Sequence, residues 1–251
     1  MNNNETGRFL GFVLLKHRSW DKDSFFKRLR DNWNIEPKDL TNAKGDENII
    51  VFEHDSMHVS LAFIPAPVPE HEAEDNAAFN FMWRDAVDQV SQHTAQIVVS
   101  VMGGEDKLES ALTFVKVCDS AIDDDTIGIY TNGIVYQPRM YSEMAQSIKE
   151  RQLPILDLVW IGLTNAGNGK FNGYTMGLEN FGKYEIEVIG CTTNPSKLLD
   201  FLTGITGYVI GEDATLKDGE TIGFTADQKL KITLSDGVEF DYKTLKIEYP
   251  Y

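Results

Sequence analysis

Positive charge is scarce in this sequence. Its 251 residues hold 23 Lys and Arg against 39 Asp and Glu, which gives a formal net charge of −16 at pH 7. A surface this negative repels phosphate backbones and anionic lipids. We therefore expect no nucleic-acid partner and no membrane role, and the charge favours a basic protein partner. The other interpretation is that the negative charge only keeps the protein soluble.

Cysteines and long apolar runs are scarce as well. The two cysteines, Cys118 and Cys191, indicate buried thiols of a reducing compartment, although a single disulfide between them stays open. No apolar run approaches the roughly 20 residues of a membrane span. The opening residues, MNNNETGRF, have neither the basic start nor the apolar stretch of a secretory signal. We therefore expect a cytoplasmic protein.

Motifs of nucleophilic catalysis and of nucleotide binding are missing. There is no G-x-S-x-G elbow, and neither cysteine has a local catalytic signature. The Gly103-Gly104 turn lacks the dinucleotide fingerprint and the P-loop lysine, and GNGKFNG at 167–173 is typical of a hairpin loop. We expect no catalytic residue and no cofactor. Because catalytic groups converge only in three dimensions, an enzyme with a site built from scattered residues stays an alternative.

The best candidate for a metal site is a short group of imidazoles and carboxylates, Glu53, His54, Asp55 and His58. These residues flank a predicted hairpin turn, where the alternation of strand side chains is interrupted. Exposed turn histidines explain the pattern as well. We therefore predict no metal site.

Apolar residues make up 42% of the chain, which is enough for a sizeable core. In residues 7–102 their spacing predicts the order β-α-β-β-α-β, which fits a ferredoxin-like unit. The predicted strands there are 7–15, 48–53, 57–64 and 95–102, with one helix after Asp21 or Asp23 and another about Trp83. Later elements are a helix ending at 123–125, a hairpin about Asn132-Gly133, strands 155–163, 171–176 and 184–190, and a helix from Asn194-Pro195.

These patterns predict an α+β fold with two ferredoxin-like βαββαβ-type units, whose mainly antiparallel sheets pack as one body. We expect an N-terminal α+β unit at 1–125 and a C-terminal one at 126–251, with a single compact domain as the alternative. The charge is uneven between them. Residues 1–125 carry 12 Lys/Arg and 23 Asp/Glu (net −11), and residues 126–251 carry 11 and 16 (net −5).

Carboxylates gather at two places in the first half. One group follows the extended PAPVP loop at 65–69, and the other ends the helix that precedes residue 126. Clustered charge steers a partner of opposite sign, although a solvated loop is the plainer interpretation. The stretch 70–75 has no Gly for the turn of an EF-hand-like calcium loop. The candidate partner-binding residues are Glu70, Glu72, Glu74, Asp75, Asp123, Asp124 and Asp125.

Several blocks resemble a known bacterial family. In chain order they include IVVSVMGGEDKLESAL, GIYTNGIVYQP, TMGLENFGKYEIEV and LKDGETIGFTADQKLKI. In these blocks, within Gly7–Tyr249, the chain resembles proteins that contain domain of unknown function 4261; the GGED turn and DGETIGF are the most specific pieces. The resemblance implies a bacterial origin and transfers no catalytic residue. Some members resemble immunity proteins, which neutralise toxins delivered between competing bacteria.

Charge, missing motifs and resemblance together predict a non-catalytic, cytoplasmic protein-binding module. Its most concrete form is an immunity protein that neutralises a bacterial toxin or effector by direct binding. Two other classes stay open: the enzyme with scattered site residues, and an oligomeric scaffold. The scaffold is suggested by aromatic residues near the C-terminus, Tyr242, Tyr249 and Tyr251. The sequence does not fix the oligomeric state.

Overall fold

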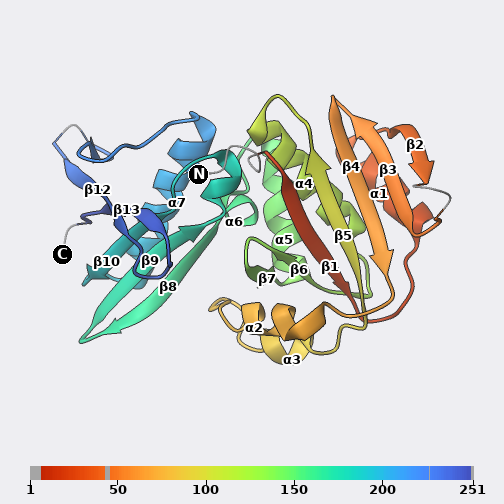
Figure 1. Ribbon diagram of the computed structural model, residues 1–251, viewed down its shortest axis with the longest axis horizontal. Helices are drawn as coiled ribbons and strands as arrows, with labels where there is room; N and C mark the ends of the chain where they lie inside the picture. The colour runs from red at the N-terminus through yellow and green to blue at the C-terminus, as the bar shows by residue number, and fades with distance from the viewer. Residues whose placement is uncertain (1–6, 43–45, 226, 250–251) are drawn as a thin grey trace. The chain divides into compact units, whose positions relative to one another are not determined.

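A computed structural model describes residues 7–42, 46–225 and 227–249 and shows a mixed α+β fold with two sheets (Figure 1). The chain divides into two compact units between Leu158 and Val159. The predicted α+β class with mainly antiparallel sheets is confirmed. Tyr251, one of the residues that suggested a scaffold, lies outside the described residues.

The first unit is built on a seven-stranded sheet in the order β2-β3-β4-β5-β1-β6-β7, in which every described pair is antiparallel. Its strands are β1 (Phe9–Leu15), β2 (Lys38–Asn42), β3 (Ile49–His54), β4 (Met57–Ile64), β5 (Ala95–Met102), β6 (Thr126–Thr131) and β7 (Ile134–Tyr136). Its helices are α1 (Lys22–Trp33), η2 (Pro69–His71), α2 (Glu72–Ala77), α3 (Ala86–Val90), α4 (Lys107–Ala121), α5 (Pro138–Ala145), η3 (Gln146–Glu150) and α6 (Ile155–Leu158).

Local sequence signals account for several of these elements. Asp21 caps α1, since its side chain accepts a hydrogen bond from Ser24 N. The β6–β7 turn places Asn132 and Gly133 at φ values of 51° and 64°, the left-handed region that a two-residue hairpin turn requires. The predicted hairpins about Asp55-Ser56 and Asn132-Gly133 are both confirmed.

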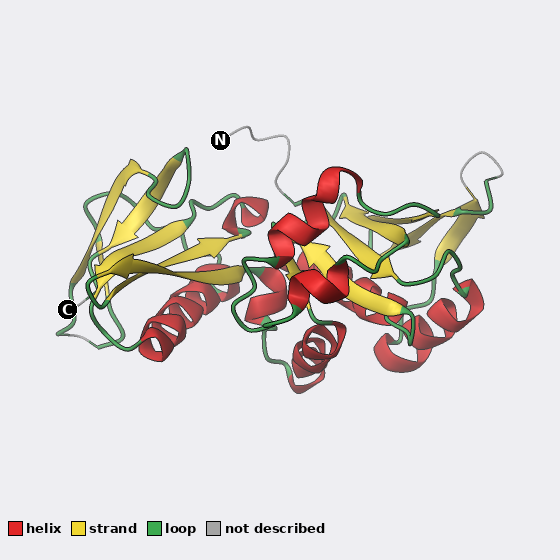
Figure 2. Ribbon diagram, turned by 90° about the horizontal axis from the view of Figure 1, so that it is seen from below, coloured by secondary structure: helices red, strands yellow, loops and turns green. Residues whose placement is uncertain are grey.

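Helices lie on both faces of the first sheet (Figures 1 and 2). The face toward α4 carries Gly11, whose missing side chain lets the Phe114 ring approach the β1 backbone. The opposite face, called the outer face here, carries Leu14, Tyr130 and Val135, which pack against α2 and α3. Because side chains alternate between the two faces of a strand, neighbouring residues of β1 pack in two different cores.

Gly11→Ala is expected to destabilise the first unit by about 1–3 kcal/mol, because a new methyl group must displace packed atoms. Its Cβ would lie 2.8 Å from Phe114 Cζ and 3.0 Å from Tyr130 O. Urea denaturation measures the loss. Adding Phe114→Leu to the alanine variant should recover part of it by making room. If the loss in the double variant equals the sum of the losses in the two single variants, the ring contact is not the cause.

The second unit is built on a six-stranded sheet in the order β11-β12-β13-β10-β9-β8. The pairs are antiparallel except that β10 runs parallel to β13. Its strands are β8 (Trp160–Gly167), β9 (Lys170–Met176), β10 (Ile186–Cys191), β11 (Thr221–Ile222), β12 (Leu230–Asp236) and β13 (Lys243–Ile247), and its helices are η4 (Leu178–Phe181) and α7 (Pro195–Gly211).

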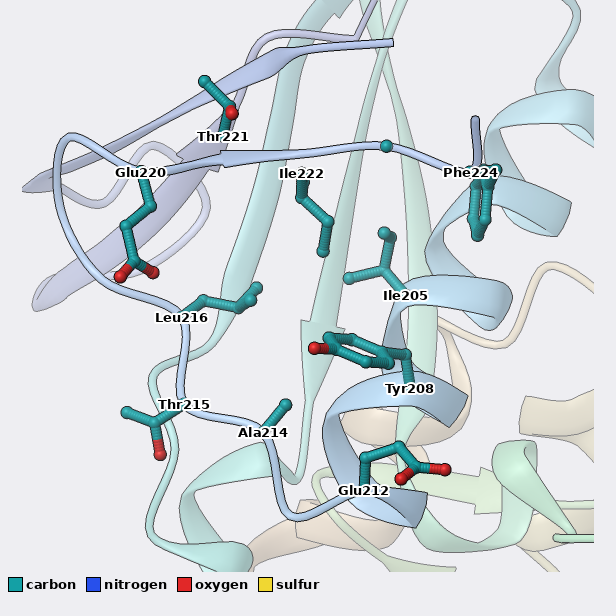
Figure 3. A pocket seen from close by; sticks show the side chains of 11 residues that line it. Ile205, Tyr208, Glu212, Ala214, Thr215, Leu216, Glu220, Thr221, Ile222 and Phe224 are labelled. Carbon is teal, nitrogen blue, oxygen red and sulfur yellow. The ribbon is translucent and has the colours of Figure 1, made fainter. Parts of the chain in front are cut away.

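Helix α7 follows one face of the second sheet (Figure 2). It begins as predicted, with Asn194 as a side-chain cap and Pro195 in the first turn. Gly173 of β9 lets Leu198 and Leu202 approach the sheet. After α7 the chain turns back, and residues 212–224 run opposite the end of the helix (Figure 3).

Two expectations about topology differ from the structure. In a ferredoxin-like order the last strand would pair only with the first, whereas β5 lies between β4 and β1 and pairs with both. The division between units falls at 158/159 instead of 125/126, because β6 and β7 continue the first sheet beyond β1. Strand order and unit boundary both depend on pairing between distant segments.

Two expectations about local structure are wrong as well. The run 155–163 is not one strand, since it contains α6 and the start of β8. The stretch 70–75 is not a loop, since it belongs to η2 and α2.

Cys118 and Cys191 are both buried and free, so the alternative of a disulfide is contradicted. No helix in the described ranges has the length and apolar character needed to cross a membrane.

Candidate protein-binding surface

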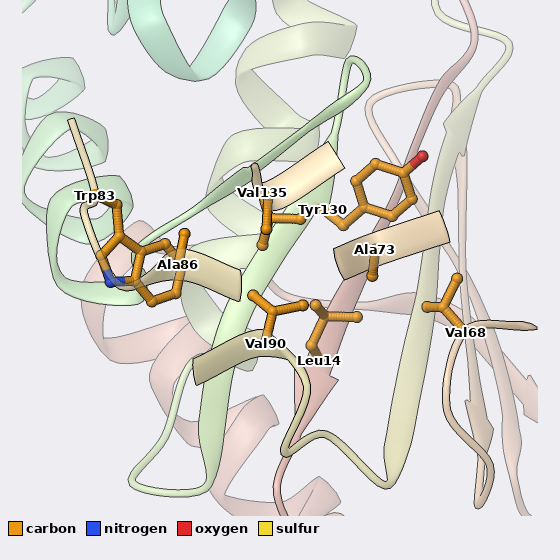
Figure 4. Close-up of a cluster of buried hydrophobic side chains, with 9 residues drawn as sticks. Leu14, Val68, Ala73, Trp83, Ala86, Val90, Tyr130 and Val135 are labelled. Atoms are coloured by element: carbon orange, nitrogen blue, oxygen red, sulfur yellow. The ribbon is translucent and has the colours of Figure 1, made fainter. Parts of the chain in front are cut away.

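The residues 65–94, called the α2–α3 segment here, cross the outer face of the first sheet. Their apolar side chains and those of the strands point toward one another (Figure 4). The cluster consists of Leu14, Val68, Ala73, Ala77, Trp83, Ala86, Val90, Tyr130 and Val135. Because this packing fixes the inner side of the segment, its outer side forms a defined surface.

The turn between α2 and α3 is anchored by a buried amide. Asn80 donates from Nδ2 to the carbonyl oxygen of Val135 in β7 at 2.8 Å, and its Oδ1 accepts from Met82 N at 3.0 Å. Its neighbours face solvent: Phe79 is 60% exposed, Phe81 47% and Met82 37%. Three large apolar side chains on one short, anchored turn mark an interaction site more strongly than scattered exposed residues do.

The structure brings three of the predicted carboxylates together on α2 and η2, the helices that precede this turn. Glu70, Glu72 and Asp75 line a hollow of about 320 Å³ at the start of α2. Glu72 also accepts a hydrogen bond from Tyr130 Oη at 2.6 Å, which ties α2 to the sheet. Burial, followed by the bond and charge of Glu72, raises the pKa of the Tyr130 hydroxyl, so the phenol stays a donor. All three side chains are exposed, but only Glu72 also has this structural role.

Glu74 is turned away from this group. Its side chain is only 16% exposed, and its Oε1 lies 3.6 Å from His71 Nδ1. Within the described ranges its Oε2 is buried without a hydrogen-bond partner. Of the four predicted carboxylates in this stretch, Glu74 is therefore the one least able to meet a partner.

The three consecutive aspartates also differ from one another. Asp123 folds into its own turn and accepts from Asp125 N and Thr126 Oγ1. Asp125 accepts from His17 Nδ1 at 2.7 Å. Of the three, Asp124 is exposed and the other two are half-buried. Asp124 and Asp125 line a second hollow of about 360 Å³ together with Asp85 and Gln89 of the α2–α3 segment. The segment therefore borders both predicted acidic groups.

Charge on the α2–α3 segment is strongly one-sided. It contains six carboxylates and one arginine, Arg84. Sequence reasoning found the acids and missed the exposed turn at 79–82, although FNFMW directly after an acidic helix is a readable signal. The surface combines two features that are typical of protein interfaces: apolar side chains at the turn, and negative charge in the residues before and after it.

The metal candidate does not form a larger group. His54 Nε2 lies 3.5 Å from Asp55 Oδ2, and His58 Nδ1 lies 3.5 Å from Glu53 Oε1, as two separate pairs. Across the residues with described positions, no cluster of three or more His, Cys, Asp or Glu could hold a metal ion. At the GGED turn, Asp106 caps α4 by accepting from Leu108 N and Glu109 N, so its carboxylate occupies the helix start.

Buried carboxylates in the second unit were not predicted. Glu185 accepts from Thr175 Oγ1 at 2.6 Å, Gly177 N at 2.7 Å and Glu179 N at 3.2 Å. Burial outweighs these donors and raises the pKa of Glu185 to about 7. Glu187, two residues along the same strand, is fully buried and holds the turn before β13. Both residues organise their surroundings through backbone and side-chain donors.

Comparison with known families bears on this second unit. Residues 174–248 match the model of Domain of unknown function (DUF4261). The chain resembles the DUF4261 family. The match contains Glu185, Glu187 and all of α7, and it leaves out the α2–α3 segment. No curated protein and no solved structure matches the chain. The DUF4261 match therefore supports the family resemblance and carries no assignment of activity.

Proposed function

We propose that this protein is a non-catalytic protein-binding module that docks a basic partner through the α2–α3 segment. In its most specific form, the partner is a bacterial toxin or effector and the chain is an immunity protein that neutralises it in the cytoplasm. That specific form rests on the family resemblance, whereas the docking surface rests on the geometry.

The exposed turn at 79–82 is the observation that carries the proposal. Buried Asn80 and Trp83 hold the turn in place, while the side chains of Phe79 and Phe81 are 60% and 47% exposed. Aromatic anchors of this kind supply most of the energy of a protein interface once they are desolvated. A rigid turn adds affinity, because little conformational entropy is lost when it binds.

The charge around the turn specifies the partner. Glu70, Asp75, Asp85 and Asp124 border the two hollows, and Lys16 is the one Lys or Arg among the described residues that line them. Lys and Arg side chains on a partner would meet these carboxylates, and the field of the chain would speed their encounter. The association should therefore weaken as salt is raised.

Purification of the tagged protein from its host at moderate salt, repeated at high salt, identifies the partner. We expect one stoichiometric basic protein that is lost at high salt. A partner that is acidic, or that binds equally at both salt concentrations, would contradict the electrostatic part of the proposal. Neutralisation of a purified toxic partner would establish the immunity form.

Reversing three exposed carboxylates is expected to weaken partner binding by about 100-fold or more, because like charges then meet across the interface. The variant is Glu70→Lys, Asp75→Lys and Asp124→Lys, which spares Glu72 and its bond to Tyr130. The matched control reverses Glu36, Glu105 and Glu150, which are also exposed.

A Phe79→Ala, Phe81→Ala double variant separates the apolar contribution from the charges. It should lose about 2 kcal/mol or more of binding free energy, the usual cost of removing a central anchor. Isothermal titration calorimetry measures both sets of variants. If reversing the control carboxylates weakens binding as much as reversing Glu70, Asp75 and Asp124, the effect comes from the net charge of the chain and not from this surface.

A further inference from the structure

The second unit contains a groove that the proposed docking surface does not use. It has a volume of about 650 Å³ and lies between the end of α7 and residues 212–224 (Figure 3). Ile205 and Tyr208 form the wall on α7, and Leu216, Ile222 and Phe224 form the opposite wall. This volume is within the usual range of small-molecule sites.

Several contacts hold the outer wall of the groove in place. Lys183 Nζ donates to Asp213 O at 2.9 Å and to Thr215 Oγ1 at 3.0 Å, and it pairs with Asp213 Oδ1 at 2.7 Å. At the other end the Phe224 ring packs on Phe201, with ring centroids 5.7 Å apart. A Cβ at Gly204 would lie 2.9 Å from Phe224 Cζ, so this glycine gives the ring its place on α7. The groove is thus built into the fold.

Behind Thr215 and Leu216 lies a second, smaller cavity of about 220 Å³. It is lined largely by apolar or aromatic groups, including Ile186, Val209 and Leu245. Because both spaces share Thr215 and Leu216, an apolar group that enters the groove has further apolar surface within reach. The interior of the site therefore favours a ligand with a hydrophobic body.

The charge at the edge of the groove has one sign. Glu212 and Glu220 line it, and no Lys or Arg does so among the described residues. Glu220 accepts from Lys217 N at 3.0 Å, which fixes its carboxylate near the opening. The faces of Tyr208 and Phe224, which are 49% and 58% exposed, can also attract a cation. The charge of the groove's own lining therefore disfavours an anionic ligand.

We propose that this groove binds a small organic cation with an apolar body, in the chemical class of arylalkyl amines. The apolar body would lie against Ile205, Leu216 and Ile222, and the ammonium group would lie at Glu220, while the charge of Glu212 adds to the negative field of the groove. The site lies within the DUF4261 match and is separate in sequence from the α2–α3 segment. Its test needs no protein partner, so its failure leaves the proposed function untouched.

Tryptamine and indole-3-propionate make a matched pair of probes, because they share an indole and differ in the sign of their charge. With the full ¹⁵N-labelled chain, we expect millimolar tryptamine to shift the amide resonances of residues 205–224. Indole-3-propionate should bind about tenfold more weakly or not at all. Equal affinity for both probes, or no shift in this region with tryptamine, would overturn the proposal.

Variants locate the bound cation. The double variant Glu212→Gln, Glu220→Gln should bind tryptamine about tenfold more weakly, while the control Glu248→Gln, exposed in the same unit, should bind it normally. Glutamine at position 220 keeps an oxygen for Lys217 N, so the loop should stay folded. Ala214→Phe should block the groove. Undiminished tryptamine binding by the double glutamine variant would contradict the role of these carboxylates.

Discussion

Glu187→Gln is expected to destabilise the second unit by about 3–5 kcal/mol, the usual cost of breaking a buried ion pair. Glu187 has no exposed surface. Lys246 Nζ lies 2.6 Å from its Oε2, and that lysine side chain is 17% exposed. An amide in place of the carboxylate would leave the lysine charge without its partner.

The same carboxylate also organises the turn between β12 and β13. Its Oε1 accepts from Glu239 N at 2.7 Å and from Val238 N at 3.1 Å, and its Oε2 accepts from Thr244 Oγ1 at 2.5 Å. A glutamine presents one oxygen and one NH₂ group, and the NH₂ group would face donors. The substitution should therefore weaken the hydrogen bonds of the turn as well as the ion pair.

This interaction also sets the response to acid. Burial alone would raise the pKa of Glu187, but Lys246, Thr244 and the two backbone N–H groups more than offset it and hold the pKa below its usual value. The native carboxylate thus binds a proton less readily than the unfolded one. Its stabilising contribution is present above the ordinary pKa of a glutamate and is lost as the pH falls through the lowered pKa.

Urea denaturation of the native protein and of Glu187→Gln at neutral and acidic pH measures both effects. The two curves should converge as the pH falls, because the native carboxylate becomes protonated too. Lys246→Met is a second variant, which leaves Glu187 its other donors. Exposed Glu248→Gln is the control. A loss for Glu187→Gln no larger than that of the control would mean that the pair contributes little.

Local signals in the sequence predicted the elements whose backbone demands a particular residue. Asn132-Gly133 predicted its hairpin because few residues adopt two consecutive positive φ values, and Asn194-Pro195 predicted the start of α7. The run 155–163 was misassigned for the opposite reason. A continuous apolar run has no period that separates a buried helical turn from a buried strand.

Pairing between distant segments was not predictable from these signals. The sequence of residues 126–136 predicts a hairpin but does not indicate which sheet the hairpin joins. The hairpin belongs to the first sheet because β6 pairs with β1. In the same way, β5 reads as a strand without revealing that it separates β4 from β1. The type of an element is determined by its local sequence, whereas strand order depends on which distant strands pair.

The proposed binding surface was predictable only in part. Charge clusters are visible in a sequence, so Glu70, Asp75 and Asp124 were found. Exposure is not visible: Phe81 and Trp83 are near neighbours of similar character, yet Phe81 is 47% exposed and Trp83 is 8% exposed. The difference arises because Trp83 packs against the outer face of a sheet whose strand order the sequence did not reveal.

Asp157→Leu is expected to stabilise the protein at neutral pH by about 2–4 kcal/mol, because it removes a buried polar group with no compensating bond. Asp157 is 1% exposed and belongs to α6. Among the described residues, neither of its carboxylate oxygens has a hydrogen-bond partner. Glu187 is also buried, but both of its carboxylate oxygens accept hydrogen bonds.

Burial, and then the charge of Asp119, raise the pKa of Asp157 well above its usual value. Asp119 itself accepts from Trp33 Nε1 at 2.9 Å and from Ser142 Oγ, so nearby donors are already taken. The native side chain therefore binds a proton that the unfolded one releases. The contribution of Asp157 is fully present below the unfolded pKa, about 3.9, and is lost as the pH rises toward the raised folded pKa.

The gain in Asp157→Asn should consequently depend on pH in the direction opposite to the loss in Glu187→Gln. Asparagine has nearly the same shape and no proton to lose, so its advantage over the native chain should be small near pH 4 and grow toward neutral pH. Denaturation at both pH values, with exposed Asp31→Asn as the control, measures it. A lower stability of Asp157→Asn than of the native chain at neutral pH would contradict this account of the buried carboxyl.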